Sequence, residues 1–201
     1  SQESGVSELR TLNSKLAFID THCHLEMTEF DEDRDKVIQR ARDAGIEAVI
    51  TVGSDLKGNI GSLRLSEKYD FIYSSVGIHP HDAKDFTEEV YQQIKTWATR
   101  CRIQDTRYRM QDTPLNPPLV RGELKGGKVV AIGETGLDYH YDSSPRDIQR
   151  EVFKKHLLLA KELELPVIIH SREAKKDTLE ILADSGINRG VLHCFSGDMD
   201  M

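Results

Sequence analysis

Past the middle of the chain stands an apolar run that ends in an acid, Val129-Val130-Ala131-Ile132-Gly133-Glu134. Apolar residues on both faces are typical of a strand buried in a parallel sheet. A helical pattern follows, and its start, Ser144-Pro145-Arg146-Asp147, has the order of a cap, a first-turn proline and a returning acid. The next apolar run is Pro166–His170. Such a strand–helix–strand unit crosses over in the right-handed sense and pairs its strands in parallel.

Similar apolar runs recur on both sides of this unit. The six expected strands are Ala17–Thr21, Ile46–Val52, Phe71–Gly77, Val129–Gly133, Pro166–His170 and Gly190–Cys194. Amphipathic helical patterns alternate with them, so the expected class is α/β, with a parallel sheet and outer helices. A doubly wound sheet and a (β/α)8 barrel both fit this alternation.

The positions of the histidines favour the barrel. Seven of the eight lie at, or just beyond, the C-terminal end of an expected strand, and only His156 lies within a helix. Catalytic groups of parallel barrels gather at that end of the strands. We therefore expect a TIM-like (β/α)8 barrel, with about six of its eight strands present.

The first expected strand runs into Asp20-Thr21-His22-Cys23-His24. Side chains alternate along a strand, so His22 and His24 point to the same side. Two imidazoles placed in this way can share one metal ion. The alternative is a pair of hydrogen-bonded core histidines. Asp20 either orients a ligand from behind or is a buried acid with a structural partner.

Three further strand ends carry groups that bind metals. Glu134 ends an apolar strand, where an uncompensated charge is costly, so it needs a cation or hydrogen-bond donors. The alternative for Glu134 is a helix N-cap. His170 and His193 end the next two strands. Together with the first pair they make five ligands, enough for two adjacent ions that share Glu134. Imidazole-rich sites suit zinc, whereas Mn or Mg prefers more oxygen.

Other residues at the same rim are candidates for binding substrate. His79 and Arg172 can contact a phosphate, Arg172 through its planar fork, or make ordinary loop hydrogen bonds. Tyr139 can stack on a base or pack against the protein. Asp138 can order the loop that follows the fourth strand.

Composition limits the class of protein. The chain has 201 residues, 27 Lys and Arg against 34 Asp and Glu, and a formal charge of −7. This balance argues against a broad nucleic-acid-coating surface, although a bound metal can dominate a local phosphate site. Three scattered cysteines predict no disulfide scaffold. No apolar run approaches the roughly 20 residues that span a bilayer, and residues 1–16 look like a polar tail, so we expect a cytoplasmic protein.

Residues 101–128 break the strand–helix rhythm. They hold three of the six prolines and six basic residues against three acids. One interpretation is a disordered surface insertion, and the other is a basic flap that touches a phosphate backbone.

The motifs form an ordered set along the chain. They are Phe18-Ile19-Asp20-Thr21-His22-Cys23-His24, Gly77-Ile78-His79-Pro80-His81, Gly133-Glu134-Thr135-Gly136-Leu137-Asp138-Tyr139, Leu165-Pro166-Val167-Ile168-Ile169-His170-Ser171-Arg172 and His193-Cys194-Phe195-Ser196-Gly197. This set resembles the TatD family of metal-dependent hydrolases, and the resemblance covers nearly all of residues 17–197 except the insertion.

The resemblance implies a distorted (β/α)8 barrel of the metal-dependent hydrolase type. It also implies a metal-dependent deoxyribonuclease, often exonucleolytic. In such an enzyme His22 and His24 would hold one divalent ion (Zn, Mg or Mn), His170 and His193 the other, and Glu134 would bridge both as the catalytic carboxylate. An activated hydroxide would attack the phosphorus, with Arg172 stabilising the transition state. The implied partner is DNA, with no membrane and no obligate protein partner. The alternatives are an ester or amide hydrolase, such as an aminoacyl-tRNA deacylase, and an inactive metal-binding chain.

The chain also departs from the family pattern. A barrel of this kind typically needs ~250 residues, which predicts a chain truncated at the C-terminus, without the last two strands. The family's final Asp, in a Thr-Asp-x-Pro setting, is then missing, since Asp198 and Asp200 stand in the wrong place for it. We expect low or no activity from such a chain, and open sheet edges that invite pairing.

Overall fold

The computed structural model describes residues 17–101 and 127–195. The expected polar tail (1–16), most of the expected insertion (102–126) and both Asp198 and Asp200 lie outside the described residues. No helix in the described ranges is long and apolar enough to cross a membrane.

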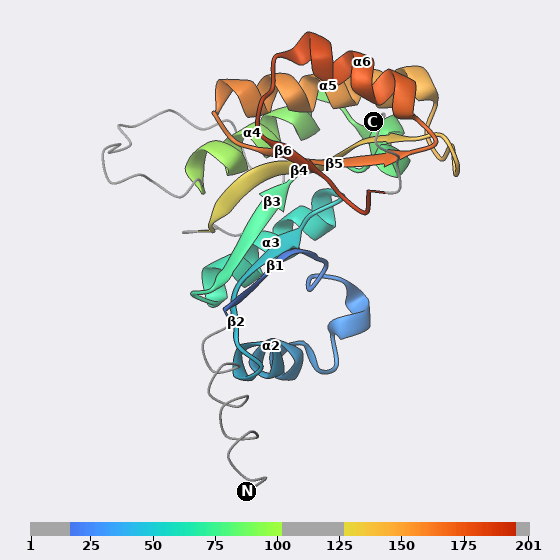
Figure 1. Ribbon diagram of the computed structural model, residues 1–201. Helices are drawn as coiled ribbons and strands as arrows, with labels where there is room; N and C mark the ends of the chain where they lie inside the picture. Colours follow the sequence, from blue (N-terminus) through green and yellow to red (C-terminus); the bar gives the residue numbers. More distant parts are fainter. Residues whose placement is uncertain (1–16, 102–126, 196–201) are drawn as a thin grey trace, which may run out of the picture.

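The described residues form a parallel six-stranded sheet with helices packed on it (Figure 1). The strands are β1 Phe18–Cys23, β2 Ile46–Val52, β3 Ile72–Val76, β4 Val129–Asp138, β5 Val167–Arg172 and β6 Gly190–Leu192. The helices are η1 Thr28–Phe30, α2 Arg34–Asp43, α3 Leu56–Lys68, η2 Pro80–Asp85, α4 Glu88–Arg100, α5 Arg146–Glu162 and α6 Lys175–Ser185.

The spatial order of the strands decides between the two expected architectures. It is β1-β2-β3-β4-β5-β6, so every strand pairs with its neighbour in sequence. A doubly wound sheet reverses its order at a switch point, and none occurs among the described strands. The sheet is therefore singly wound, as a half-barrel, which confirms the barrel type and the six strands that were expected.

Two apolar clusters hold the helices on the sheet. The larger one packs Trp97 of α4 and Phe153 of α5 against Ile132 of β4. The smaller one packs Ile38 of α2 against Ile72 of β3. Full burial of such a side chain contributes about 1.5–3 kcal/mol, so these contacts fix the strands whose ends carry the histidines.

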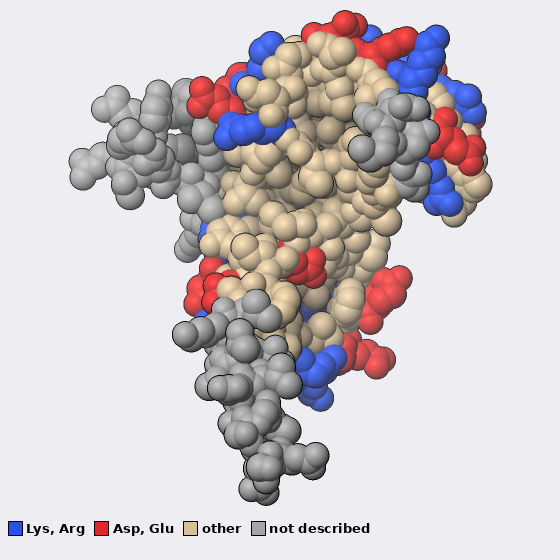
Figure 2. All heavy atoms as spheres, in the orientation of Figure 1, with Lys and Arg blue, Asp and Glu red and all other residues tan. Residues whose placement is uncertain are grey.

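Each of the two outer strands pairs on one side only among the described residues, and both expose apolar side chains. On β1, Phe18 is 52% and Ile19 is 64% exposed, and on β6 Val191 is 49% exposed. The middle of the face turned to the viewer in Figure 2 is mostly uncharged, and charged side chains gather toward its ends. Unpaired apolar edges of this kind are prone to pair with other chains.

Strand β4 is longer than expected and irregular. It continues to Asp138, so Glu134 lies inside a strand, and the helix N-cap alternative for Glu134 is wrong. The pairing of β4 with β5 shifts between Ile132 and Thr135. Within this shift the Glu134 N–H donates to the Gly53 carbonyl at 3.1 Å. Such irregularities re-aim a side chain next to active sites, and this one presents Glu134 to the histidines.

The expected cap of α5 is also wrong. Helix α5 begins at Arg146, its N-cap position is Pro145, and no side chain caps it. The Ser144 hydroxyl instead donates to the His81 carbonyl at 2.7 Å and accepts from the Lys84 N–H at 3.1 Å. Ser144 therefore joins the start of α5 to η2, the segment that carries His81.

His156 of α5 fixes the turn between β3 and η2. It is fully buried, its Nε2 accepts from the Ile78 N–H at 3.2 Å, and its Nδ1 donates to the Val152 carbonyl at 2.8 Å. Burial lowers the pKa of His156 to about 4, so the ring is neutral in the folded chain at neutral pH. This ring positions the residue directly before His79.

Acid should therefore destabilise the chain partly through His156. Below pH 6.5 the unfolded chain binds a proton that the folded chain does not bind until about pH 4. Stability falls across that window by about 1.4 kcal/mol per pH unit. Urea unfolding at pH 7 and 5.5 should show a loss about 1 kcal/mol smaller for His156→Gln than for the wild type. Equal losses would show that His156 does not carry this effect.

Candidate metal centre

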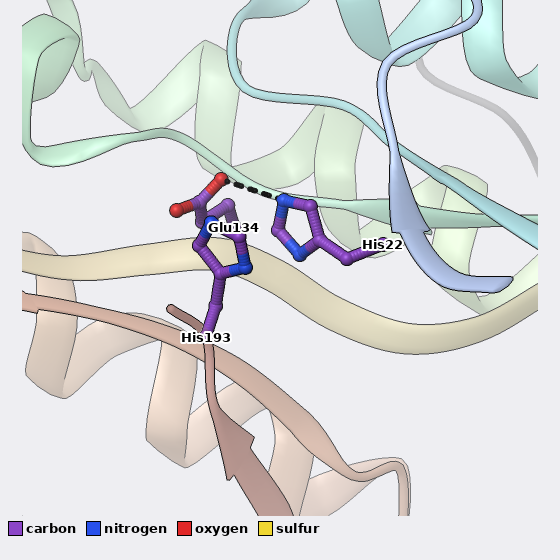
Figure 3. A group of neighbouring side chains, drawn as sticks. All are labelled: His22, Glu134 and His193. Atoms are coloured by element: carbon purple, nitrogen blue, oxygen red, sulfur yellow. Dashed lines mark ion pairs between the residues drawn. The ribbon is translucent and has the colours of Figure 1, made fainter. Parts of the chain in front are cut away.

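Histidines at the ends of four strands, β1, β3, β5 and β6, converge on Glu134 of β4. Two trios of potential metal ligands share this carboxylate, and within each trio the ligand atoms lie within 4.8 Å of one another. The first trio is His22, Glu134 and His193, which point toward one another from β1, β4 and the end of β6 (Figure 3). The second trio is His79, Glu134 and His170. The structure thus brings together residues that are far apart in the sequence.

The two oxygens of Glu134 face different imidazoles. Oε2 lies 3.4 Å from His22 Nε2 and 3.9 Å from His24 Nε2. Oε1 lies 3.1 Å from His170 Nδ1 and 3.8 Å from His79 Nε2. Only 4% of the Glu134 side chain is exposed, so water does not screen these pairs. The buried Glu134 carboxylate therefore contacts two separate groups of imidazole nitrogens, one through each oxygen.

The first side of the centre joins both outer strands of the sheet. The rings of His22 and His193 stack, with centroids 3.5 Å apart and planes at 12°. His22 Nε2 and His24 Nε2 are 3.2 Å apart, a hydrogen-bond distance. Among the described residues, His22 Nδ1 is buried without a hydrogen-bond partner. The expected proximity of His22 and His24 is present, and their role as metal ligands stays a prediction.

Glu26 orients His24, which sequence reasoning missed. His24 Nδ1 lies 2.9 Å from the Val52 carbonyl and 3.3 Å from Glu26 Oε1, and the hydrogen bond with Glu26 raises the pKa of His24. Thr51 Oγ1 in turn donates to Glu26 Oε2 at 2.5 Å. The signal was available, since Glu26 continues the two-residue spacing of His22 and His24.

Asp20 was considered from the sequence as the acid that orients a histidine ligand, but unlike Glu26 it does not contact an imidazole ring. It is exposed, and its Oδ1 accepts from the His22 N–H at 3.1 Å. The interpretation of Asp20 as a buried acid is therefore wrong. Its contact with the main chain of β1 fixes the backbone at His22 rather than an imidazole ring.

Asp138 organises the second side of the centre. Its Oδ2 lies 3.0 Å from both His170 Nε2 and His81 Nε2, and the residue is fully buried. Its Oδ1 accepts from the N–H groups of His140 and Tyr141 at 3.0 and 2.8 Å, so the expected ordering of the loop is confirmed. The contacts of Asp138 with His170 and His81 were not foreseen, because nothing in the sequence relates these three positions.

The charges at the centre are set by burial and by the imidazoles. Burial alone would raise the pKa of Glu134, but hydrogen bonds with His170 and His22 outweigh it and hold this pKa well below the usual range. The pKa of Asp138 is likewise lowered to about 2, because hydrogen bonds from the Tyr141 N–H, His81 and His170 outweigh burial. Burial lowers the pKa of His79 to about 3. At neutral pH both carboxylates are charged and His79 is neutral.

These donors fit divalent metal ions. Donation from His24 Nδ1 to the Val52 carbonyl leaves the ring's lone pair on Nε2, which lies 3.9 Å from the charged Glu134 oxygen. A lone pair and a carboxylate that face one another call for a cation between them. On the other side the pairing of His170 Nε2 with Asp138 leaves Nδ1 directed at Glu134. Carboxylate-oriented imidazoles are characteristic of metal sites.

The three expected substrate-binding residues lie in different surroundings. His79 Nδ1 accepts from the His81 N–H at 3.2 Å, the expected loop hydrogen bond, while its Nε2 faces Glu134. Arg172, at the end of β5, places its guanidinium carbon 4.8 Å from the centroid of the Tyr141 ring.

Tyr139 is engaged away from the metal ligands. Its hydroxyl donates to Asp177 of α6 at 2.6 Å, and the Arg146 guanidinium of α5 lies over its ring at 4.4 Å. These contacts join the ring to α5 and α6, and its role in binding substrate stays a prediction.

A model of one protein family, described as TatD related DNase, matches residues 19–201. The chain belongs to the TatD family. This assignment confirms the resemblance drawn from the motifs, and it makes the protein a relative of metal-dependent hydrolases. The strand ends that hold the two trios all fall inside the matched range.

Individual TatD relatives agree with this assignment. The uncharacterized metal-dependent hydrolase YabD of Bacillus subtilis is 40% identical over 184 residues, which are 90% of this chain and 62% of YabD. The 3'-5' ssDNA/RNA exonuclease TatD of a Rahnella species is 32% identical over 87% of this chain and 57% of that protein. The structure of the TatD homologue YjjV of Escherichia coli superposes with a TM-score of 0.73 and 29% identity, over 91% of this chain and 62% of YjjV. This chain thus spans about three fifths of the length of these relatives.

Proposed function

We propose that this TatD-family chain is the metal-binding part of a phosphodiesterase that acts on DNA, with Glu134 shared between two divalent ions. One observation carries the proposal, the separation of the two Glu134 oxygens between His22 and His24 on one side and His79 and His170 on the other. His193 adds a further nitrogen to the first side. The Rahnella relative is named as an exonuclease for single-stranded DNA and RNA, which supports the choice of substrate.

The described residues have distinct tasks in this proposal. Glu134 and its imidazoles would hold the ions, and two ions about 3.5–4 Å apart supply positive charge to the attacking and leaving oxygens of a phosphoryl displacement. Glu26 and Asp138 keep His24 and His170 in place, so that little reorganisation is needed when substrate binds. Arg172 stands at the same rim, where its planar fork can bind a phosphate oxygen pair.

The test is hydrolysis of a 3'-labelled single-stranded oligodeoxynucleotide and of bis(p-nitrophenyl) phosphate. The chain is assayed with Mg²⁺, Mn²⁺ or Zn²⁺, with and without a chelator. We expect cleavage that the chelator abolishes and that added metal restores. Cleavage that resists the chelator, or no cleavage with any of the ions, would overturn the proposal. Turnover of an aminoacyl ester but of neither phosphodiester would support the deacylase alternative instead.

A further inference from the structure

An exposed aromatic side chain stands beside the candidate metal centre. Tyr141 follows β4 and is 58% exposed. The Arg172 guanidinium carbon lies 4.8 Å from the centroid of its ring. The imidazoles of His140 and His81 meet it in T-shaped contacts, with centroids 4.7 and 5.4 Å away. Tyr141 therefore lies among groups of positive or hydrogen-bonding character, while much of its ring stays open to solvent.

The residue that holds the backbone of Tyr141 in place, Asp138, also contacts the candidate metal ligands. The buried Asp138 accepts from the Tyr141 N–H through Oδ1 and contacts His170 Nε2 and His81 Nε2 through Oδ2. The His81 ring lies 4.4 Å from that of His79. One carboxylate thus fixes both the backbone of Tyr141 and a ligand of the second trio. Tyr141 lies in the turn after β4, and its hydrogen bond with Asp138 holds that turn to the end of the strand.

We propose that Tyr141 is the stacking surface for a base of a single DNA strand whose phosphate lies at the His79–Glu134–His170 trio. Every base has a π-face, so stacking on an exposed aromatic ring binds single strands without a required sequence. Arg172, held against the same ring, presents positive charge where the strand's next phosphate would pass. Tyr139 is less suited to this role, because it is only partly exposed and its hydroxyl donates to Asp177.

The inference rests on the proposed phosphodiesterase function, and its test measures binding as well as turnover. The probe is a fluorescein-labelled hexathymidylate with phosphorothioate linkages, which slow hydrolysis, titrated into the metal-loaded chain. A second probe is the same strand with abasic residues at its 3' end. The variants are Tyr141→Ala, Tyr141→Phe and, as a control, Leu158→Ala, which removes another exposed apolar side chain (62%) on α5.

We expect the wild-type chain to bind the intact strand about tenfold more tightly than the abasic strand, the size of one base–aromatic stack. Tyr141→Ala should lose this preference and bind the intact strand about tenfold more weakly, with little change for the abasic strand. Tyr141→Phe keeps the ring and should behave like the wild type, as should Leu158→Ala.

Three results would overturn the inference. They are an unchanged affinity in Tyr141→Ala, an equal loss for intact and abasic strands, and no binding of the intact strand at all. Hydrolysis of bis(p-nitrophenyl) phosphate separates the two proposals. Suppose that this hydrolysis depends on metal and is kept in Tyr141→Ala. A failed binding test then contradicts only the stacking role of Tyr141, and the proposed phosphodiesterase function stands. If the wild type hydrolyses neither phosphodiester, the proposed function fails with it.

Discussion

Glu134→Gln should abolish metal-dependent turnover and lower the affinity for Mn²⁺ or Zn²⁺ by more than about 100-fold, the upper range for merely supporting residues. An amide has nearly the volume of the carboxylate, so the apolar packing around β4 is kept. It carries no charge, however, and it offers one oxygen instead of two. Both trios share this one side chain, so both sides of the centre lose their negative ligand together.

Isothermal titration of the metal-free chain with each ion measures this loss, and circular dichroism verifies that the variant is folded. Glu162→Gln is a matched control, because the Glu162 carboxylate lies on the surface of α5 and pairs with Lys95 at 2.7 Å. It should bind metal like the wild type. If Glu134→Gln binds two ions with unchanged affinity, Glu134 is not their shared ligand.

Gly136→Ala should destabilise the fold strongly, through the contact between β4 and β5. Gly136 has a φ of +140°, and a Cβ placed there would lie 2.0 Å from the His170 carbonyl oxygen. Neither the conformation nor the distance suits an L side chain, and the obstacle is backbone. We expect the free energy of unfolding to fall by about 3 kcal/mol or more, with β5 displaced.

Urea unfolding at pH 7 measures this effect, and Gly58→Ala is the control. Gly58 lies in the first turn of α3, where the new Cβ would lie 3.2 Å from Asp55 Oδ1, the side-chain oxygen that caps the helix. Alanine is favoured over glycine in a helix by about 1 kcal/mol, so this control should change stability by no more than about that amount. A Gly136→Ala chain as stable as Gly58→Ala would mean that β4 and β5 separate there at little cost.

The inner strands were predictable because they are short apolar runs, and burial on both faces leaves a pattern that needs no knowledge of partners. Helix patterns between the runs then implied parallel pairing, which the order β1 to β6 confirms. The irregular part of β4 was not predictable. Its shift depends on the Gly53 carbonyl, a group more than 70 residues away that pairs with Glu134. The sequence pattern of β4 alone cannot predict that its partner is the Gly53 carbonyl.

The candidate metal centre also has a part that the sequence predicted and a part that it did not. Histidines and one acid at strand ends could be recognised, because parallel strands end at a common edge. The supporting acids were harder, since Asp138 contacts His81 and His170 from positions with no regular spacing. Ser144 failed as a cap for a related reason. Its hydroxyl found the His81 carbonyl, a tertiary partner, in place of the local N–H groups of α5.

The stacked rings of His22 and His193 link the first strand of the sheet to the last. Their separation therefore reports the curvature of all six strands at once. A substitution under β3 that flattened the sheet by a few degrees would pull these rings apart, and would also lengthen the distance between His22 and Glu134. An ion bound by His22, Glu134 and His193 would connect the first strand to the last across the open side of the half-barrel. Metal affinity would then depend on the curvature of the whole sheet.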